Sequence, residues 1–201
     1  MSKAEETKAR IIRHAADLFN QHGYAGSSMS DIMQATGLKK GGIYNHFTSK
    51  DELAIAAFDF AIEQVSQRYG QAVREKRGAI ARLNAIIHAF STALDEVSLK
   101  GGCPILNTAI ESDDTHPALR ERTQRAMYDW RTLIHRVVQR GIDRGEILPT
   151  VNPDCVATIL ISTLEGALMM TKLYGDRIHL QRAAEHLNQY VSTLQSAQPT
   201  Q

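Results

Sequence analysis

Residues 27–53 constrain the fold of this chain more than any other stretch, because helical patterns and helix-ending residues alternate there at short intervals. Ser28 and Asp31 are three residues apart and fit a capping box, which opens a helix. Gly37 follows about two turns later and tolerates the left-handed backbone conformation that ends a helix. A second helical stretch then runs from about Lys39 to Phe47. The pattern predicts two short helices joined by a tight turn.

The second of these helices is expected to have two different faces. Ile43 and Phe47 are four residues apart and predict a buried side. The other side carries lysines near the helix start and two glycines, and each glycine costs a helix interior about 1 kcal/mol. Such residues suit DNA, because lysines neutralise phosphates and glycines allow a close backbone approach; the alternative is a surface turn with solvated lysines. The predicted DNA-contacting residues of this helix-turn-helix are Ser28, Lys39, Lys40, Gly41, Gly42, Tyr44, Asn45, His46 and Lys50.

The stretch resembles the N-terminal domain of TetR-family transcriptional repressors. The family pattern is Lys, two small residues, an aliphatic residue, Tyr, any residue, Tyr or His, Phe, and soon Lys-Asp/Glu-x-Leu. Residues 40–47 and 50–53 follow it at every position, and the resemblance covers about residues 7–55, with upstream agreement at Ile12, Ala15, Ala16, Phe19, Gly23 and Tyr24. It implies a ligand-responsive regulator, a repressor that a small-molecule effector releases from a palindromic double-stranded DNA operator.

Charge is distributed unevenly along the 201 residues, although the formal net charge is only +1. Residues 1–50 hold seven Lys/Arg and four Asp/Glu, which gives +3, and the remaining 16 Lys/Arg and 18 Asp/Glu give −2. A mildly basic head and a mildly acidic body suit a protein that binds DNA through one end.

Other classes of protein are disfavoured by what the chain lacks. The N-terminus does not resemble a signal peptide, and no apolar run approaches the ~18 residues that span a bilayer, so we expect a cytoplasmic protein with no membrane partner. Cys103 and Cys155 make neither a disulfide framework nor a zinc site. We expect no metal and no cofactor.

Helical periodicity continues to the C-terminus, and strand alternation is absent. Beyond residues 3–22 and the helix-turn-helix, helices are expected at about residues 49–69, 79–97, 104–113, 116–144, 154–173 and 180–194. We therefore predict an all-α fold. A three-helix DNA-binding domain would occupy residues 1–48, and a six-helix ligand-binding and dimerisation domain would occupy residues 49–201.

The helix near residues 154–173 carries apolar residues on more than one face. A two-fold four-helix bundle between two copies would bury them, and small residues such as Gly166 would allow close contact. The alternative is a helix buried in the core of one chain. The residues predicted to form the homodimer are Val156, Ile159, Leu160, Thr163, Leu164 and Ala167.

The resemblance also implies a small-molecule pocket in the helical body. Pockets and cores are both mainly apolar, so these residue types also suit an ordinary core. Cys103 lies at a helix start, where a thiol becomes more reactive, and so a redox or electrophile sensor is an alternative to a small apolar filler. The candidate pocket residues are Phe90, Cys103, Leu106, Asn107, Ile110, Met127, Trp130, Leu164, Leu168 and Met169.

Two further classes of function are weighed against the regulator. An all-helical enzyme is disfavoured because the eight histidines form no metal-ligand pair and no nucleophile elbow or phosphate loop occurs. An interaction module that does not bind DNA would show no salt-dependent affinity for a duplex. We therefore expect a regulator and no catalytic residues.

Overall fold

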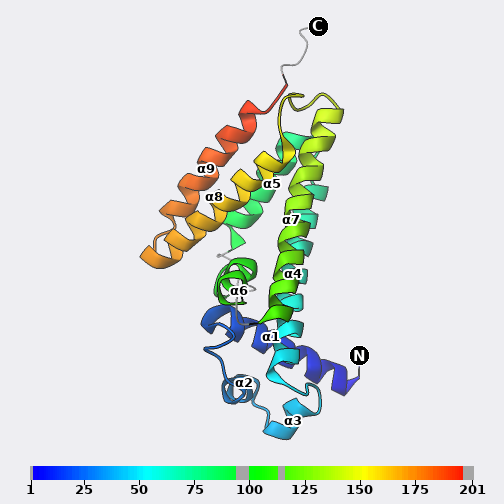
Figure 1. Cartoon of the computed structure of the whole chain (residues 1–201), viewed down its shortest axis with the longest axis vertical. Helices are drawn as coiled ribbons and strands as arrows, with labels where there is room; N and C mark the ends of the chain where they lie inside the picture. Colours follow the sequence, from blue (N-terminus) through cyan, green and yellow to red (C-terminus); the bar gives the residue numbers. More distant parts are fainter. Residues whose placement is uncertain (1, 94–99, 113–115, 197–201) are drawn as a thin grey trace. The chain divides into compact units, whose positions relative to one another are not determined.

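The computed structural model describes residues 2–93, 100–112 and 116–196, and these ranges contain nine α-helices (Figure 1). One isolated antiparallel β-bridge, between Ile147 and Gln195, is the only β pairing in these ranges. The predicted all-α fold is confirmed, with three helices before residue 49 and six after it. The helices are α1 (Lys3–His22), α2 (Met29–Thr36), α3 (Lys40–Tyr44), α4 (Lys50–Arg74), α5 (Ala79–Ser91), α6 (Pro104–Ser112), α7 (Pro117–Asp143), α8 (Pro153–Tyr174) and α9 (Ile178–Thr193).

Local capping signals explain most of the helix ends. Proline is the first residue of α6, α7 and α8, where its missing N–H costs nothing. The Asn152 side chain accepts hydrogen bonds from the N–H groups of Asp154 and Cys155, at 2.9 and 3.1 Å, and so caps α8. Gly175 ends that helix with φ of 67°. These signals lie within a few residues of each helix end, which is why the sequence located most ends well.

Three helix boundaries differ from the sequence expectation by three residues or more. Helix α3 ends at Tyr44, three residues before the predicted end at Phe47, and α4 continues to Arg74 rather than ending near Tyr69. Helix α5 ends at Ser91. Its predicted continuation to Val97 falls in residues 94–99, outside the described part of the chain.

The chain forms two compact units, and each unit is made of two separate segments of the sequence. Unit 1 comprises Met1–Val65 and Glu96–Ala126, and unit 2 comprises Ser66–Asp95 and Met127–Gln201. The limits of the units fall within α4 and α7. Helix α6 therefore belongs to unit 1, together with the three N-terminal helices. The division after residue 48 remains a prediction about function.

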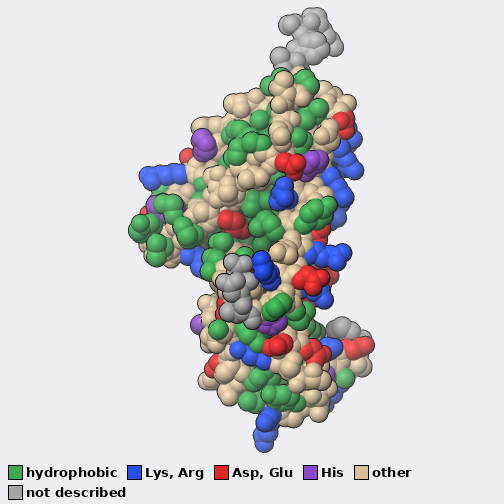
Figure 2. All heavy atoms as spheres, in the orientation of Figure 1, with side chains coloured by type: hydrophobic (Ala, Val, Ile, Leu, Met, Phe, Trp, Pro, Cys, Tyr) green, Lys and Arg blue, Asp and Glu red, His purple; other side chains and the backbone are tan. Residues whose placement is uncertain are grey.

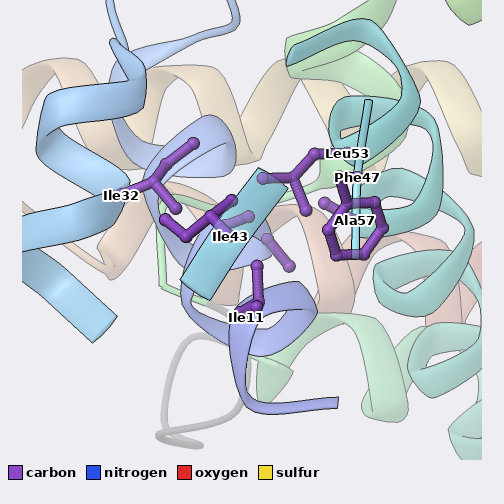
Figure 3. Close-up of a cluster of buried hydrophobic side chains, with 8 residues drawn as sticks. Ile11, Ile32, Ile43, Phe47, Leu53 and Ala57 are labelled. Carbon is purple, nitrogen blue, oxygen red and sulfur yellow. The ribbon is translucent and has the colours of Figure 1, made fainter. Parts of the chain in front are cut away.

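Unit 1 is organised around one cluster of buried aliphatic and aromatic side chains (Figure 3). Ile11 of α1, Ile32 of α2, Ile43 of α3 and Leu53 of α4 are fully buried, and Phe47 is 1% exposed. Burying each such side chain contributes about 1.5–3 kcal/mol, so the four helices share one core. The five-residue α3 is too short to be stable by itself and is held in place by this packing.

One residue of α2 is placed differently from the sequence expectation. From the helical spacing alone we expect Ala35, three residues after Ile32, to share its buried side; in the structure Ala35 is exposed and Thr36 is buried instead. The Thr36 hydroxyl donates to the carbonyl oxygen of Ile32 at 2.7 Å, which satisfies the polar group inside the core.

Unit 2 is built on α5, α8 and α9, which pack against one another, with further residues from α4 and α7. Leu83, Leu160, Leu164 and Leu187 are fully buried there. The Trp130 ring of α7 is stacked between Tyr69 and Phe90, with ring centroids 5.6 Å away on both sides. These three aromatic rings form a buried stack that joins α4, α5 and α7 within the unit.

Helix α8 is long and apolar enough to cross a membrane by length and composition alone. The sequence expectation that no such segment exists is therefore corrected. Half of its apolar window is buried against protein, and core helices of soluble proteins meet the same criterion.

Candidate nucleic-acid interface

Helix α2 begins at the predicted capping box. The Ser28 hydroxyl accepts from the Asp31 N–H at 3.2 Å, and the Asp31 carboxylate accepts from the Ser28 N–H at 2.7 Å. The hydrogen bonds from the side chain and backbone of Ser28 lower the pKa of Asp31. Gly37, with φ of 68°, ends the helix in the left-handed conformation. The turn that sets the direction of α3 therefore follows from local residue types.

Helix α3 has the two faces predicted from its sequence. Ile43 faces the unit 1 core, and so does Phe47, which lies in the turn after the helix. The Phe47 N–H donates to the Ile43 carbonyl at 3.1 Å. The predicted contact residues of this segment lie on the outside. Lys39, Lys40, Gly41, Tyr44 and Asn45 are exposed, and Gly42 and His46 are partly exposed.

The two glycines of α3 are not required by packing within the chain. A Cβ added at Gly41 would meet no atom within 4 Å, and one added at Gly42 would make ordinary contacts with Leu38 at 3.5–3.9 Å. Their backbone is not left-handed. Larger side chains would fit and would favour the helix, so the bare surface is better explained by something that approaches from outside.

Three lysines of unit 1 lie over aromatic rings. The Lys40 Nζ lies 5.5 Å from the Tyr44 ring centroid, the Lys50 Nζ 4.1 Å from the Tyr24 ring and the Lys8 Nζ 5.3 Å from the Phe47 ring. Such contacts orient a cation without neutralising it.

Neither lysine at the start of α3 has a carboxylate partner within the described ranges, since none of the ion pairs found there involves Lys39 or Lys40. Lysine or arginine side chains project at the end of unit 1 where α2 and α3 lie (Figures 1 and 2). These charges are available to phosphates.

The start of α4 is held by two neighbouring caps. The Ser49 hydroxyl accepts from the Glu52 N–H at 3.1 Å, which is the first half of the capping box that Ser49 and Glu52 suggest by their spacing. The Glu52 carboxylate, however, accepts from the N–H and hydroxyl of Thr48, at 2.7 and 2.8 Å. The hydrogen bonds from Thr48 lower the pKa of Glu52. These bonds fix the chain between α3 and Lys50, the last of the predicted contact residues.

Tyr24 is a part of the site that sequence reasoning matched to a family pattern without giving it a role. Its hydroxyl donates to the Asp51 carboxylate, and burial together with this carboxylate raises the pKa of Tyr24 to about 12. Its ring meets the His116 imidazole edge-on, with centroids 5.0 Å apart. Tyr24 thus links the segment after α1 to the start of α4 through Asp51, and its ring packs against the Lys50 ammonium group.

Most of the residues predicted for dimerisation are buried inside the single chain. Val156, Leu160, Leu164 and Ala167 are buried within unit 2, and Ile159 and Thr163 are partly buried. The outer face of α8 is a different stripe at helical spacing. It carries Cys155, Ile159, Ser162, Gly166, Met169 and Leu173, of which Met169 is 56% and Leu173 74% exposed.

The ten predicted pocket residues are divided between the two units. Cys103, Leu106, Asn107 and Ile110 lie in unit 1, and Ile110 is 75% exposed. The others lie in unit 2, where Met169 is exposed, Met127 is partly buried, and the remaining four are buried: Phe90, Trp130, Leu164 and Leu168.

Unit 1 contains a small cavity of about 40 Å³ between α1, α4, α6 and the start of α7. Asn107 lines it, beside Phe19, Tyr24, Glu111 and His116. The volume is far below the ~300–1,000 Å³ typical of pockets that enclose drug-sized ligands. As it stands, the cavity has room for little more than water.

No group of three or more His, Cys, Asp or Glu side chains that could hold a metal ion occurs in the described ranges. Cys103 is partly buried and Cys155 is exposed, and neither forms a disulfide.

Two family models match the chain in sequence. The model described as bacterial regulatory proteins of the tetR family matches residues 11–57, and the model described as a tetracyclin repressor-like C-terminal domain matches residues 79–187. The first spans α2 and α3 with the predicted contact residues. The second covers more than half of the chain.

Solved structures and curated relatives agree with these matches. A TetR transcriptional regulator from Chloroflexus aurantiacus is 46% identical, covering 98% of this chain and 100% of its own, with a TM-score of 0.94. A TetR-family regulator from Cytophaga hutchinsonii is 31% identical, covering 98% and 99%, with a TM-score of 0.90. The HTH-type transcriptional repressor ComR of Escherichia coli is 30% identical over 76% of this chain and 73% of its own.

Proposed function

This chain belongs to the TetR family of DNA-binding transcriptional regulators, and we propose that α3 is the helix with which it reads a DNA major groove. The observation that carries the proposal is the contrast between the two sides of α3. Ile43 anchors the helix in the core, while Lys39, Lys40 and the bare Gly41 backbone face outward. A helix held from one side can enter a groove with the other.

The remaining predicted contacts divide by chemistry. Lys39, Lys40 and Lys50 neutralise phosphates or reach guanine edges, and Tyr44 offers a hydroxyl to phosphate and a ring to a thymine methyl group. Ser28, at the N-terminus of α2, adds a hydroxyl near the positive end of that helix, where a phosphate is favoured. Phosphate contacts position the unit, and base contacts select the sequence.

We place the homodimer on the exposed stripe of α8. Contiguous exposed apolar side chains mark interaction surfaces, and Met169 and Leu173 provide them here. A Cβ at Gly166 would meet no atom within 4 Å, so a partner helix could approach closely at that point. A two-fold dimer would bind half-sites about 34–36 Å apart, or a multiple of that distance, on a near-palindromic operator.

Oligomeric state tests this surface directly. Light scattering should give twice the mass of one chain for the natural protein and the mass of one chain for Gly166→Arg. Gln181→Arg, which introduces the same charged side chain at an exposed position of α9 away from the stripe, should stay dimeric. A Gly166→Arg protein that remains a dimer would place the interface elsewhere.

Effector binding is assigned to unit 2. Trp130 Nε1, Asn84 Oδ1 and Thr171 Oγ1 are buried without a hydrogen-bond partner. Unsatisfied buried polar atoms are costly, and a polar ligand or water would satisfy them. Trp130 is the single tryptophan of the chain, so its fluorescence reports on this region alone.

The regulator acts as a cytoplasmic repressor in this proposal, as the name of the ComR relative suggests for that protein. It carries no catalytic activity and requires no cofactor. The first experiment is binding of the purified protein to the DNA beside its own gene, with a salt titration. Tight binding with a salt slope and two protected half-sites supports the proposal, and equal affinity for operator and bulk DNA contradicts it.

A further inference from the structure

Helix α6 is joined to the end of α1 and the following turn by a carboxylate. The Glu111 side chain accepts hydrogen bonds from the backbone N–H of Tyr24 at 2.7 Å and of Ala25 at 2.6 Å. Charge-assisted hydrogen bonds of this kind are among the stronger ones in proteins. Ser28, which caps α2, follows Ala25 by only three residues. The carboxylate therefore fixes the backbone of the segment that leads into the helix-turn-helix.

A pair of asparagines makes a second attachment one turn earlier on α6. The Asn107 side-chain amide donates to the backbone and side-chain oxygens of Asn20, at 3.0 and 2.9 Å, and to the carbonyl of Gly101 at 3.0 Å. The Asn20 amide donates to the carbonyls of Lys100 and Gly102, at 2.7 and 2.8 Å. Glu111, Asn107 and Asn20 together are called the α6 clasp below.

Two glycines allow this close approach. Gly23 has φ of +78°, and a Cβ there would lie 2.8 Å from a Glu111 carboxylate oxygen. Gly101 has φ of +96°, and its Cβ would lie 2.3 Å from the Asn20 carbonyl oxygen. Any larger residue at either position would push α6 away from α1. The two glycines therefore leave the space that the hydrogen bonds of the clasp require.

We propose that Glu111 and Asn107 are positioning residues for DNA recognition, which act by fixing the α1–α2 turn. The inference rests on the proposed DNA-reading role of α3. Neither side chain belongs to the core cluster of unit 1, which is formed by Ile11, Ile32, Ile43 and their neighbours. The clasp therefore acts on how the turn is held and contributes no side chain to the core.

The mechanism follows from the chain order. Helix α2 packs on α1, and α3 packs on both through the shared core, so the direction in which the chain leaves α1 sets the placement of the reading helix. Without the carboxylate, the Tyr24 and Ala25 N–H groups bond to water and the turn gains freedom. Specific binding then requires the turn to be ordered again, which weakens it.

The clasp also gives α6 an influence on the reading helix. The segment that carries Asn107 and Glu111 lies in the sequence between α5 and the second half of α7, both of which belong to unit 2. A change at α6 that breaks these hydrogen bonds would release the turn without touching any DNA contact. Couplings of this kind typically change an affinity about 5- to 150-fold.

The test uses the full-length protein and its operator. We expect Glu111→Ala to weaken operator binding about tenfold and Glu111→Gln, which keeps one acceptor oxygen, to weaken it less. Asn107→Ala should act in the same direction. Glu121→Gln, an exposed carboxylate on α7 in the same unit, is the matched control and should leave the affinity unchanged.

Five readouts separate positioning from a general loss of structure. The dimer mass should be unchanged, and the thermal midpoint should fall too little to explain the loss of operator affinity at the temperature of the binding assay. Amide exchange at Tyr24 and Ala25 should accelerate in the Glu111 variants. The salt slope should stay the same, because no phosphate contact is removed. Affinity for non-operator DNA should change less than affinity for the operator.

The possible outcomes are distinguishable from failure of the proposed function. The natural protein could bind the operator, and both Glu111 variants and Asn107→Ala could bind it with the same affinity. That result would overturn the proposed role of the clasp and leave the DNA-reading role of α3 intact. Loss of binding that merely tracks a lowered melting temperature would also overturn it. A natural protein with no operator preference would instead contradict the proposed function.

Discussion

The two compact units treat their buried polar groups differently. In unit 1 the buried Thr36 hydroxyl and the partly buried Glu111 carboxylate and Asn107 amide all have backbone hydrogen-bond partners. Among the described residues of this unit the exception is His116 Nε2, which is buried without a hydrogen-bond partner and lies 3.9 Å from the Asp51 carboxylate. In unit 2 the Trp130 indole N–H and the Asn84 side-chain oxygen are buried without partners. A unit that must hold one geometry satisfies most of its polar groups internally, whereas several unsatisfied groups suit a unit that accepts a ligand.

The largest expected effect tests whether the units are separate in stability. Phe47→Ala should destabilise unit 1 by about 3–5 kcal/mol, because it removes a nearly fully buried aromatic side chain from the shared core. Denaturant unfolding followed by circular dichroism should show an early transition. Trp130 fluorescence, which reports only on unit 2, should change at the later one; a single shared transition would mean that the units unfold together.

The next largest effect tests the outer face of α3. Lys40→Ala and Tyr44→Ala should each weaken operator binding by about 1–3 kcal/mol, and Lys40→Ala should also reduce the salt slope by about one. Both proteins should remain dimers with normal melting curves, because neither side chain is buried. Lys76→Ala, an exposed lysine in unit 2, is the control. Unchanged affinity in both α3 variants would remove this helix from the interface.

A smaller effect separates stability from function at one position. Gly41→Ala should raise the free energy of unfolding by about 0.4–1 kcal/mol, because the site has open space and alanine favours a helix. Operator affinity should fall, since the added methyl group meets the approaching DNA. An alanine variant that binds the operator as tightly as the natural protein would show that the bare backbone is not needed there.

The smallest effect concerns the caps around α2 and α4. The pKa values of Asp31 and Glu52 are lowered in the folded state, so the stability that these carboxylates contribute is present at neutral pH. It is lost as the pH falls through and below their ordinary values of 3.8 and 4.5. Asp31→Asn should therefore flatten the acid side of the stability curve of unit 1, measured by denaturant unfolding from pH 7 to 3. If the stability of Asp31→Asn fell with acid as steeply as that of the natural protein, the pH dependence would come from other groups.

Much of the proposed DNA-reading site could be predicted because its signals are local. Ser28 with Asp31, Gly37, and the spacing of Ile43 and Phe47 act within one or two helical turns, and the structure confirms each of them. The faces of α8 could not be assigned in this way. Apolar residues surround that helix, and only its packing against α5 and α9 decides which of them stay exposed.

The sequence by itself determined the helical content, most helix ends and the two faces of α3, because hydrogen bonds and caps within a helix depend on near neighbours. Tertiary structure alone decided that α6 joins the N-terminal helices, that Thr36 replaces Ala35 in the core, and that Glu111 holds the turn at Tyr24. Tyr24 and Glu111 are 87 residues apart in the chain. No local pattern specifies such a partner, since the contact forms only when the two helices pack together.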